Sequence, residues 1–367
     1  PVTPRRQRQM CIRDRQTLTG LCVAQDPEDA HDATRPLQAV LDDENALGDE
    51  LLRLGLWLAD YYQHPLGEVL GTLLPAEARR GAALQIRKQR FWRLRDSPVA
   101  LRRAPRQAAL LAYLKDCGGR AAHPALRDAG FDPAIIRAVA AKGLIEADDQ
   151  TGDEAGAFAD PGCQARQRSA EEHPAGPGSG PGSGPASGPA SEASPRPTLN
   201  AEQLAALKQL REQGDGFAAT LLEGVTGSGK TEIYLQRIEQ VRNRGRQVLV
   251  LVPEIALTPQ TLARFEARFG RAATLHSNMT DQQRLQIWLR CRAGLEGILI
   301  GTRSAVLTPF RDLGLIVVDE EHDGSFKQQE GLRYSARDVA VKRAHDLDIP
   351  LLLGSATPSF ESLHNVR

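Results

Sequence analysis

The sequence has no excess of charge of either sign. Lysine and arginine total 46, aspartate and glutamate also total 46, and the formal net charge of the 367 residues is zero. Global charge therefore gives no argument for a polyanionic partner, because long-range attraction needs a net opposite charge. Any nucleic-acid site has to be local.

Cysteine is scarce and scattered. The five cysteines form no C-x-x-C pair, and no histidine stands at ligand spacing from them. Structural zinc sites need such closely spaced pairs, so we expect no zinc site in these residues. Scattered cysteines fit a reducing cytoplasm better than secretion.

Long hydrophobic runs are also missing. None approaches the roughly 20 residues that span a bilayer. The basic start PVTPRRQRQMCIRDRQ is followed by no apolar signal-peptide core. We therefore expect a cytoplasmic protein with no membrane partner. The same start shows no strand periodicity, which predicts an atypical tail over residues 1–16.

Glycine, serine, proline and alanine dominate from Gly176, in GPGSGPGSGPASGPASEASPRP. Such a segment cannot bury enough apolar area to offset the entropy of ordering. The acidic stretch before it, ADDQTGDEAGAFAD, has neither helical nor strand periodicity. Together they predict a flexible linker over residues 147–196, between two ordered parts.

The first ordered part is expected to be helical. In DELLRLGLWLADYYQHPLGEVLGTLLP the apolar residues recur at helical spacing and break at Pro65, which predicts a helical hairpin within residues 17–100. Three short helical patterns followed by KGLIE favour a winged helix-turn-helix over residues 101–146. Residues 134–141 are then the candidate recognition helix, although ordinary helix packing explains the pattern equally well.

A basic run covers residues 79–106. It holds ten arginines or lysines and a single acid, Asp96, with Phe91 and Trp92 interleaved. Such a run is often only a solvated face. Beside a winged helix it can equally contact phosphates, and the residues alone leave both interpretations open.

The second ordered part, residues 197–367, alternates apolar strands with amphipathic helices, from FAATLLEG to IPLLLGSAT. Near-continuous apolar strands separated by helices predict a parallel sheet covered on both faces. The expected fold class is α/β, with a nucleotide-binding layout.

The octamer GVTGSGKT fits the phosphate-loop pattern G-x-x-x-x-G-K-[ST] and lies between a predicted strand and a predicted helix. Its backbone N–H groups would wrap phosphates at the positive end of the helix dipole. Lys230 is expected to reach the β- and γ-phosphates of ATP, and Thr231 to ligate Mg²⁺. The other cofactor-binding residues predicted in the octamer are Gly224, Thr226, Gly227, Ser228 and Gly229.

Acidic residues follow the apolar strand LIVV in DEEH. The carboxyl end of a parallel strand is where ligands of open α/β sheets bind. We expect Asp319 to hold Mg²⁺ and Glu320 to act as the general base on the attacking water. His322 has either a functional role or only a packing or hydrogen-bonding one.

The order of the motifs resembles that of superfamily 2 helicases. GVTGSGKTEIYL, LVPEIALTPQ, GTRSAVLTPF, DEEHDGSFKQQEGLRYSARDVAVKRA and LLGSATPSFES are similar to bacterial replication-restart helicases in particular. LADYYQHPLGEVLGTLLP is similar to the end of that family's amino-terminal DNA-binding domain. The likeness covers about 40–146 and 197–367. It implies a RecA-like motor lobe preceded by a partial DNA-binding domain and the winged-helix-like domain.

The resemblance also implies an activity. Members are ATP-dependent 3′→5′ DNA helicases that recognise stalled or branched replication forks and start primosome assembly. The implied partners are forked and single-stranded DNA, single-stranded DNA-binding protein and primosome proteins. Two alternatives stay open: another superfamily 2 DNA translocase, and a truncated chain that binds DNA and ATP without unwinding.

Particular residues take roles by this resemblance. Gln203 is implied to read adenine, although a helix-surface glutamine after an Asn200 cap explains it too. The segment Phe326–Asp338 is implied to be the family's aromatic-rich loop that senses single-stranded DNA. Aromatic residues in a loop can instead plug a core. The implied DNA-sensing side chains are Phe326, Lys327, Arg333, Tyr334 and Arg337.

The sequence departs from the family at both ends. Its start lacks the family's β-rich pattern, which puts the pocket for a nascent 3′ end in doubt. The family's second motor lobe, arginine finger and cysteine-rich zinc module are expected to lie outside this chain. We therefore expect a fragment that does not unwind DNA by itself.

Overall fold

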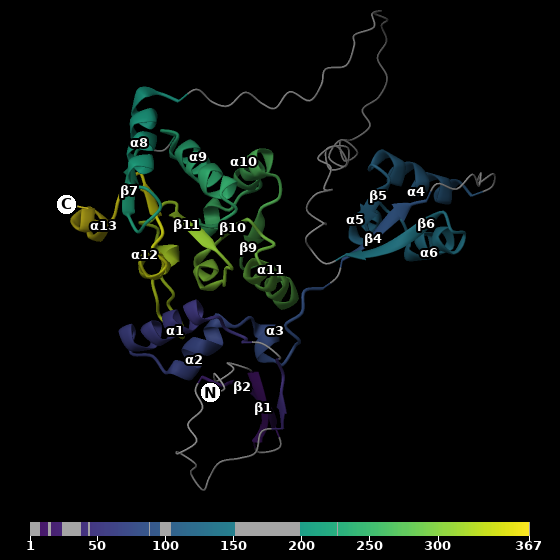
Figure 1. Ribbon diagram of the computed structural model, residues 1–367, viewed down its shortest axis with the longest axis horizontal. Helices are drawn as coiled ribbons and strands as arrows, with labels where there is room; N and C mark the ends of the chain where they lie inside the picture. The colour runs from purple at the N-terminus through teal and green to yellow at the C-terminus, as the bar shows by residue number, and fades with distance from the viewer. Residues whose placement is uncertain are drawn as a thin grey trace, which may run out of the picture. The chain divides into compact units, whose positions relative to one another are not determined.

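The computed structural model describes residues 8–13, 16–23, 38–42, 45–87, 89–95, 104–150, 199–225 and 227–366. They belong to two compact units (Figure 1). One combines residues up to Gln85 with those from Pro197 onward, and the other is Ile86–Arg196.

A six-stranded sheet is the centre of the first unit. Its order is β7-β12-β11-β8-β10-β9, and each neighbouring pair of these strands is parallel. Every residue of β8, β10, β11 and β12 is buried, which explains their unbroken apolar sequences. The predicted α/β motor-lobe fold is confirmed. The strands are β7 (Ala219–Glu223), β8 (Gln247–Leu251), β9 (Ala273–Leu275), β10 (Ile298–Gly301), β11 (Leu313–Val318) and β12 (Leu351–Ser355).

Helices cover both faces of this sheet (Figure 1). Val248 and Val250 pack in one core cluster with helices α8, α9 and α10, while α11 and α12 contact the sheet on the face of Leu249 and Leu251. The helices are α8 (Ala201–Glu212), α9 (Lys230–Asn243), α10 (Pro259–Phe269), α11 (Asp281–Ala293), α12 (Ala336–Asp346) and α13 (Phe360–Val366). Short 3-10 turns are η1 (Glu254–Ala256), η2 (Arg303–Leu307) and η3 (Gly324–Phe326).

The predicted helical hairpin is present as α1 (Asp49–Tyr61) and α2 (Leu66–Leu73), followed by α3 (Ala76–Arg79). Before it, β1 (Arg8–Arg13) pairs antiparallel with β2 (Gln16–Leu21) and β3 (Ala39–Val40). The prediction that residues 1–16 hold no strand is therefore wrong for Arg8–Arg13. Strand β1 forms because its backbone pairs with two neighbouring strands. This pairing does not require a regular alternation of apolar and polar residues, which the sequence lacks here.

A buried ion pair fastens the hairpin to the motor lobe. The guanidinium of Arg343 on α12 is 1% exposed and donates to both carboxylate oxygens of Glu50 on α1, at 2.7 and 2.9 Å. Its third nitrogen donates to the carbonyl of Val306 at 2.7 Å. Trp288 Nε1 on α11 donates to the carbonyl of Leu73 at 3.2 Å. The hairpin and the lobe are thus joined by directional bonds as well as by apolar packing.

The second unit has the predicted order of three helices. They are α4 (Pro105–Asp116), α5 (His123–Asp128) and α6 (Pro133–Ala141). Strand β4 (Gln89–Leu94) pairs antiparallel with β5 (Arg120–Ala122) and β6 (Ile145–Gln150). Two predicted borders therefore differ from the structure: β4 lies before the predicted start at 101, and β6 runs past 146 into the predicted linker. The winged-helix assignment itself stays a prediction.

The interleaved aromatic residues of the basic run do not face solvent. Phe91 and Trp92 are 6% and 7% exposed. Acidic residues of β6 also neutralise part of the run, because Arg95 Nε lies 2.9 Å from Glu146 and Arg93 lies 3.7 Å from Asp148. The sequence alone did not reveal these ion pairs, because they depend on the register between strands whose partners are about fifty residues apart.

We expect Arg343→Met to lower the free energy of unfolding by about 3 kcal/mol, because it strands the Glu50 carboxylate and the Val306 carbonyl. The adjacent Lys342→Met is the matched control. It removes an exposed pair with Asp346 and should cost less than about 1 kcal/mol. Urea unfolding of the two variants measures the difference. Equal losses would contradict the anchoring role of Arg343.

Candidate nucleotide-binding site

Three strand ends meet at one edge of the sheet. The N–H of Gly224, after β7, donates to the carbonyl of Ser355 on β12 at 3.1 Å. The N–H of Glu321, after β11, donates to the carbonyl of Gly354 at 3.0 Å, and that of Asp319 to Leu251 at 2.9 Å. The phosphate loop, the DEEH acids and the SAT segment are therefore assembled side by side, as predicted for parallel strands.

The phosphate loop turns directly into α9. Gly229 caps the helix with φ 86°, and Gly227 has φ 83°, a region that favours glycine. A Cβ on Gly229 would also lie 2.3 Å from Nε2 of Gln203, so an added side chain would displace this amide from its place at the loop. The loop geometry explains why these two positions are glycine. Thr226, predicted in the same loop, lies outside the described residues.

Lys230 points back into the loop. Its Nζ donates to the carbonyl of Gly224 at 2.6 Å and lies 4.0 Å from Oε1 of Glu320. The side chain is only 9% exposed. Two of the three predicted catalytic residues, Lys230 and Glu320, are thus brought together, and the ammonium is held where the helix begins. The third, Asp319, directly precedes Glu320. Thr231 is half-buried in the first turn of α9.

Asp319 is a buried carboxylate. Burial raises its pKa, and the neighbouring charge of Glu320 raises it further. Tyr234 Oη donates to Oδ1 of Asp319 at 3.2 Å, and the Glu320 N–H lies 3.2 Å from the same oxygen. Because these donors stabilise the ionised form only in part, a cation near Asp319 would favour it.

Sequence reasoning missed Tyr234 and Gly354. A Cβ on Gly354 would lie 1.4 Å from Tyr234 Oη, so only glycine leaves room for the tyrosine to reach Asp319. Tyr234 follows Lys230 by four residues and so shares its helix face. That spacing was the signal in the sequence that could have identified Tyr234. No local pattern could have identified Gly354, because its partner, Tyr234, lies on another element.

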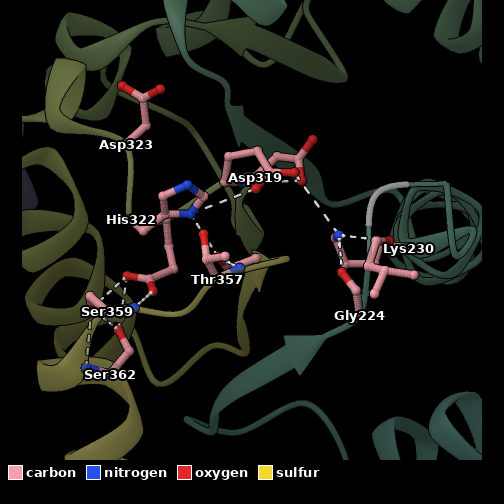
Figure 2. A network of polar contacts seen from close by, with 12 residues as sticks. Gly224, Lys230, Asp319, His322, Asp323, Thr357, Ser359 and Ser362 are labelled. Atoms are coloured by element: carbon pink, nitrogen blue, oxygen red, sulfur yellow. Dashed lines mark hydrogen bonds and ion pairs between the residues drawn. The ribbon is translucent and has the colours of Figure 1, made fainter.

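Glu320 has a strained backbone. Its φ of 49° is in the left-handed region, which is uncommon for a residue with a side chain. His322 Nδ1 lies 3.6 Å from Oε2 of Glu320 and 2.6 Å from Oγ of Ser355 (Figure 2). Ser355 Oγ in turn accepts the N–H of Thr357 at 3.0 Å. His322 thus makes a hydrogen bond to the SAT segment and approaches Glu320, while a functional role for it stays a prediction.

Glu321 and Arg337 form a second polar network (Figure 2). The buried Glu321 carboxylate accepts from Arg337 at 3.1 Å, from the Ser359 N–H at 2.7 Å and from Ser362 Oγ at 2.9 Å. Burial alone would raise the pKa of Glu321, but these hydrogen bonds outweigh it and hold the pKa below its usual range. Arg337 thus bridges to an acid in the structure, and the DNA-sensing role that the resemblance implies for it stays a prediction. The role of Glu321 was not predicted.

Gln203 touches the phosphate loop. Its Oε1 accepts the Asn200 N–H at 3.0 Å in a capping box, and its Nε2 donates to the carbonyl of Ser228 at 2.8 Å. The helix-cap interpretation is therefore present in the structure. The contact of Gln203 with adenine stays a prediction, and its side chain lies at the phosphate loop.

The predicted stacking of two aromatic rings on DNA bases needs correction. Phe326 is 2% exposed and Tyr334 is 5% exposed, so neither ring offers a free face. They fill the core beneath their own loop, as the alternative held. Lys327 and Arg333 are exposed and stay candidates for phosphate contact.

The residues present fit a phosphate ligand. Within the described ranges, Ser228 Oγ is a buried side-chain atom that lacks a hydrogen-bond partner, which is costly unless a ligand supplies one. The two left-handed glycines and the start of α9 add backbone N–H donors. The same residues fit Mg·ATP, with Lys230 at the phosphates and Thr231 and Asp319 as metal ligands.

Two further findings concern the described residues alone. They contain no helix long and apolar enough to cross a membrane. Across these ranges, no group of three or more His, Cys, Asp or Glu side chains is arranged to hold a metal ion.

Ser228→Ala should have opposite effects on stability and on binding. Removing an unpaired buried hydroxyl should leave the thermal midpoint without nucleotide unchanged or slightly higher. Affinity for Mg·ATP should fall about tenfold if the hydroxyl bonds a phosphate oxygen, a charge-assisted bond. Calorimetric titration and thermal unfolding measure both. Lower stability with unchanged affinity would contradict the assignment.

Two protein-family models match parts of this chain. Residues 200–366 match the DEAD/DEAH box helicase family, and residues 12–75 match a 3′ DNA-binding domain family. The Pyrococcus furiosus Hef helicase domain is 20% identical, with a TM-score of 0.33, over 45% of this chain and 34% of that one.

Curated relatives are closer. The chain is 43% identical to the replication restart protein PriA of Haemophilus influenzae over 85% of this chain and 40% of that protein. The chain is 33% identical to the Chlamydia pneumoniae protein of the same name, over 90% of this chain and 42% of that protein. It is 48% identical to the Bacillus subtilis protein of the same name, over 45% of this chain and 21% of that protein. The chain thus spans about two-fifths of the length of the Haemophilus influenzae and Chlamydia pneumoniae proteins. Motifs, fold and relatives agree, and the chain belongs to the family of the replication restart protein PriA.

Proposed function

We propose that this chain carries the DNA-docking region and first motor lobe of an ATP-dependent 3′→5′ DNA helicase. The helicase would recognise stalled or branched forks and start primosome assembly for replication restart. One observation carries the proposal: Lys230 and the DEEH acids meet at one sheet edge, in the same unit as the segment that matches a 3′ DNA-binding domain.

In the proposed hydrolysis, Lys230 moves from the Gly224 carbonyl to the phosphates and neutralises their charge. Glu320 accepts a proton from the attacking water, and the 3.6 Å approach of His322 orients its carboxylate. Asp319, held by Tyr234, and Thr231 bind the metal. When bound, Mg²⁺ would polarise the phosphate oxygens.

The proposed partners follow from the family. Relatives named for replication restart suggest forked and single-stranded DNA, single-stranded DNA-binding protein and primosome proteins as partners, and the cytoplasm as the setting. The exposed Lys327 and Arg333 are proposed to meet DNA phosphates beside the ATP site.

Lys230→Ala should lower the affinity of this chain for Mg·ATP by about tenfold or more, because it removes a charged partner of the phosphates. Glu320→Gln should keep that affinity within about threefold, since the amide keeps the shape but cannot take a proton. Titration with a fluorescent ATP analogue compares them. The proposed roles would be wrong if Lys230→Ala bound as tightly as the parent.

Fork binding should weaken steeply with salt. Contact with about four phosphates predicts a loss of about 100-fold in affinity between about 50 and 200 mM salt. Arg137, exposed on α6, is a candidate contact, so Arg137→Ala should reduce the salt slope by about one. Arg211→Ala, at an exposed arginine of α8 in the other unit, is the control. Fluorescence anisotropy on a labelled fork gives the slopes. A flat salt dependence would rule out phosphate contact.

A further inference from the structure

The loop between the DEEH acids and α12 is held at one side by the motor lobe itself. Arg303, after β10, donates to the carbonyls of Ser325 at 3.1 Å and Lys327 at 2.9 Å. An antiparallel bridge between Lys327 and Ser335 closes the loop. The Gln328 N–H also donates to the backbone carbonyl of Tyr334 at 2.8 Å. It is therefore a defined hairpin whose backbone is bonded at both ends.

Its other side is held by the amino-terminal hairpin. Tyr62 is the C-cap residue of α1, and its Oη accepts the N–H of Ser335 at 3.2 Å. Ser335 is buried and is the N-cap of α12, where its Oγ accepts the Asp338 N–H at 3.3 Å. One tyrosine from the segment that matches the DNA-binding domain thus fixes the first turn of a motor-lobe helix.

That first turn carries Arg337. Two residues after Ser335, Arg337 donates to Glu321 at 3.1 Å and to Ser359 Oγ at 2.7 Å. Glu321 directly follows Glu320, the proposed base, which lies 4.0 Å from Lys230. A continuous series of bonds therefore runs from Tyr62 through Ser335 and Arg337 to the acids of the nucleotide site.

The Arg343–Glu50 pair strengthens this connection. It ties Glu50, at the start of α1, to α12 two turns further along the same helix. Because this pair holds the far part of α12, a shift of Tyr62 at the other end of α1 would act on the start of α12, where the loop enters.

We propose that Tyr62 is a positioning residue that couples DNA bound by the amino-terminal segment to the acids beside Lys230, through the Ser335 amide. The inference rests on the proposed function, because it needs a chain that binds both DNA and Mg·ATP. In this proposal Tyr62 acts through the loop and the first turn of α12.

The experiment uses Tyr62→Phe in the 367-residue chain, with Tyr61→Phe as the matched control. Tyr61 is the adjacent tyrosine, is 60% exposed and stacks on Trp57 with ring centroids 4.8 Å apart. The same atom is removed from both residues. Affinity for a fluorescent ATP analogue with Mg²⁺ is measured without and with a saturating single-stranded oligonucleotide, and the ratio of the two affinities is the coupling factor.

Tyr62→Phe should reduce the coupling factor by about threefold or more, the loss expected for one hydrogen bond. Each affinity measured without the other ligand should stay within about twofold of the parent. Hydrogen exchange of the amides at 335–338 should speed up in Tyr62→Phe and not in Tyr61→Phe. A purely structural role would lower stability without this selective loss.

An unchanged coupling factor in Tyr62→Phe would overturn the inference. So would an equal loss in Tyr61→Phe, or a parent chain that binds both ligands without coupling. A parent chain that fails to bind Mg·ATP or DNA at all would instead overturn the proposed function, and with it the coupling that depends on it.

Discussion

The site depends on one constraint, the parallel pairing of β7, β12 and β11. In a parallel sheet the carboxyl ends of neighbouring strands lie at the same edge. The pairing of Ser355 with Glu223, and of Val318 with Leu353, therefore fixes the loops that follow these strands beside one another. Gly224 and Ser355, which are more than a hundred residues apart in the sequence, become neighbours through this pairing. The polar contacts at the edge then refine positions that the backbone has already set.

Burial gives that edge its chemistry. Asp319 and Glu320 are adjacent acids, and both burial and mutual repulsion raise the pKa of Asp319. Such a pair is stabilised by positive charge, which Lys230 supplies only in part at 4.0 Å from Glu320. Glu321 is different, because Arg337 and two serines satisfy its carboxylate. One acid of the triplet is thus a fixed structural element, while the other two remain available to a cation and to water.

Sequence predicted what local patterns determine. The phosphate loop, the acids after β11, the hairpin α1–α2 and the order of α4, α5 and α6 are each set within one continuous segment of the chain. The contacts that sequence missed are long-range: Tyr234 with Gly354, Arg343 with Glu50, and Arg95 with Glu146. Strand β1 was missed for a related reason, because its pairing partners, and not its own alternation, stabilise it.

The burial of Phe326 and Tyr334 changes how their loop can respond to DNA. Rings that are 2% and 5% exposed cannot stack on bases, but they fix the loop backbone against the core. Tyr62 and Arg303 also bond the loop from two sides. A segment held in this way transmits displacement better than a free one. In the proposed coupling, a pull on the exposed Lys327 or Arg333 would pass along the backbone to Ser335 and the start of α12. The proposed sensing would then need charge at the surface of the loop and packing beneath it.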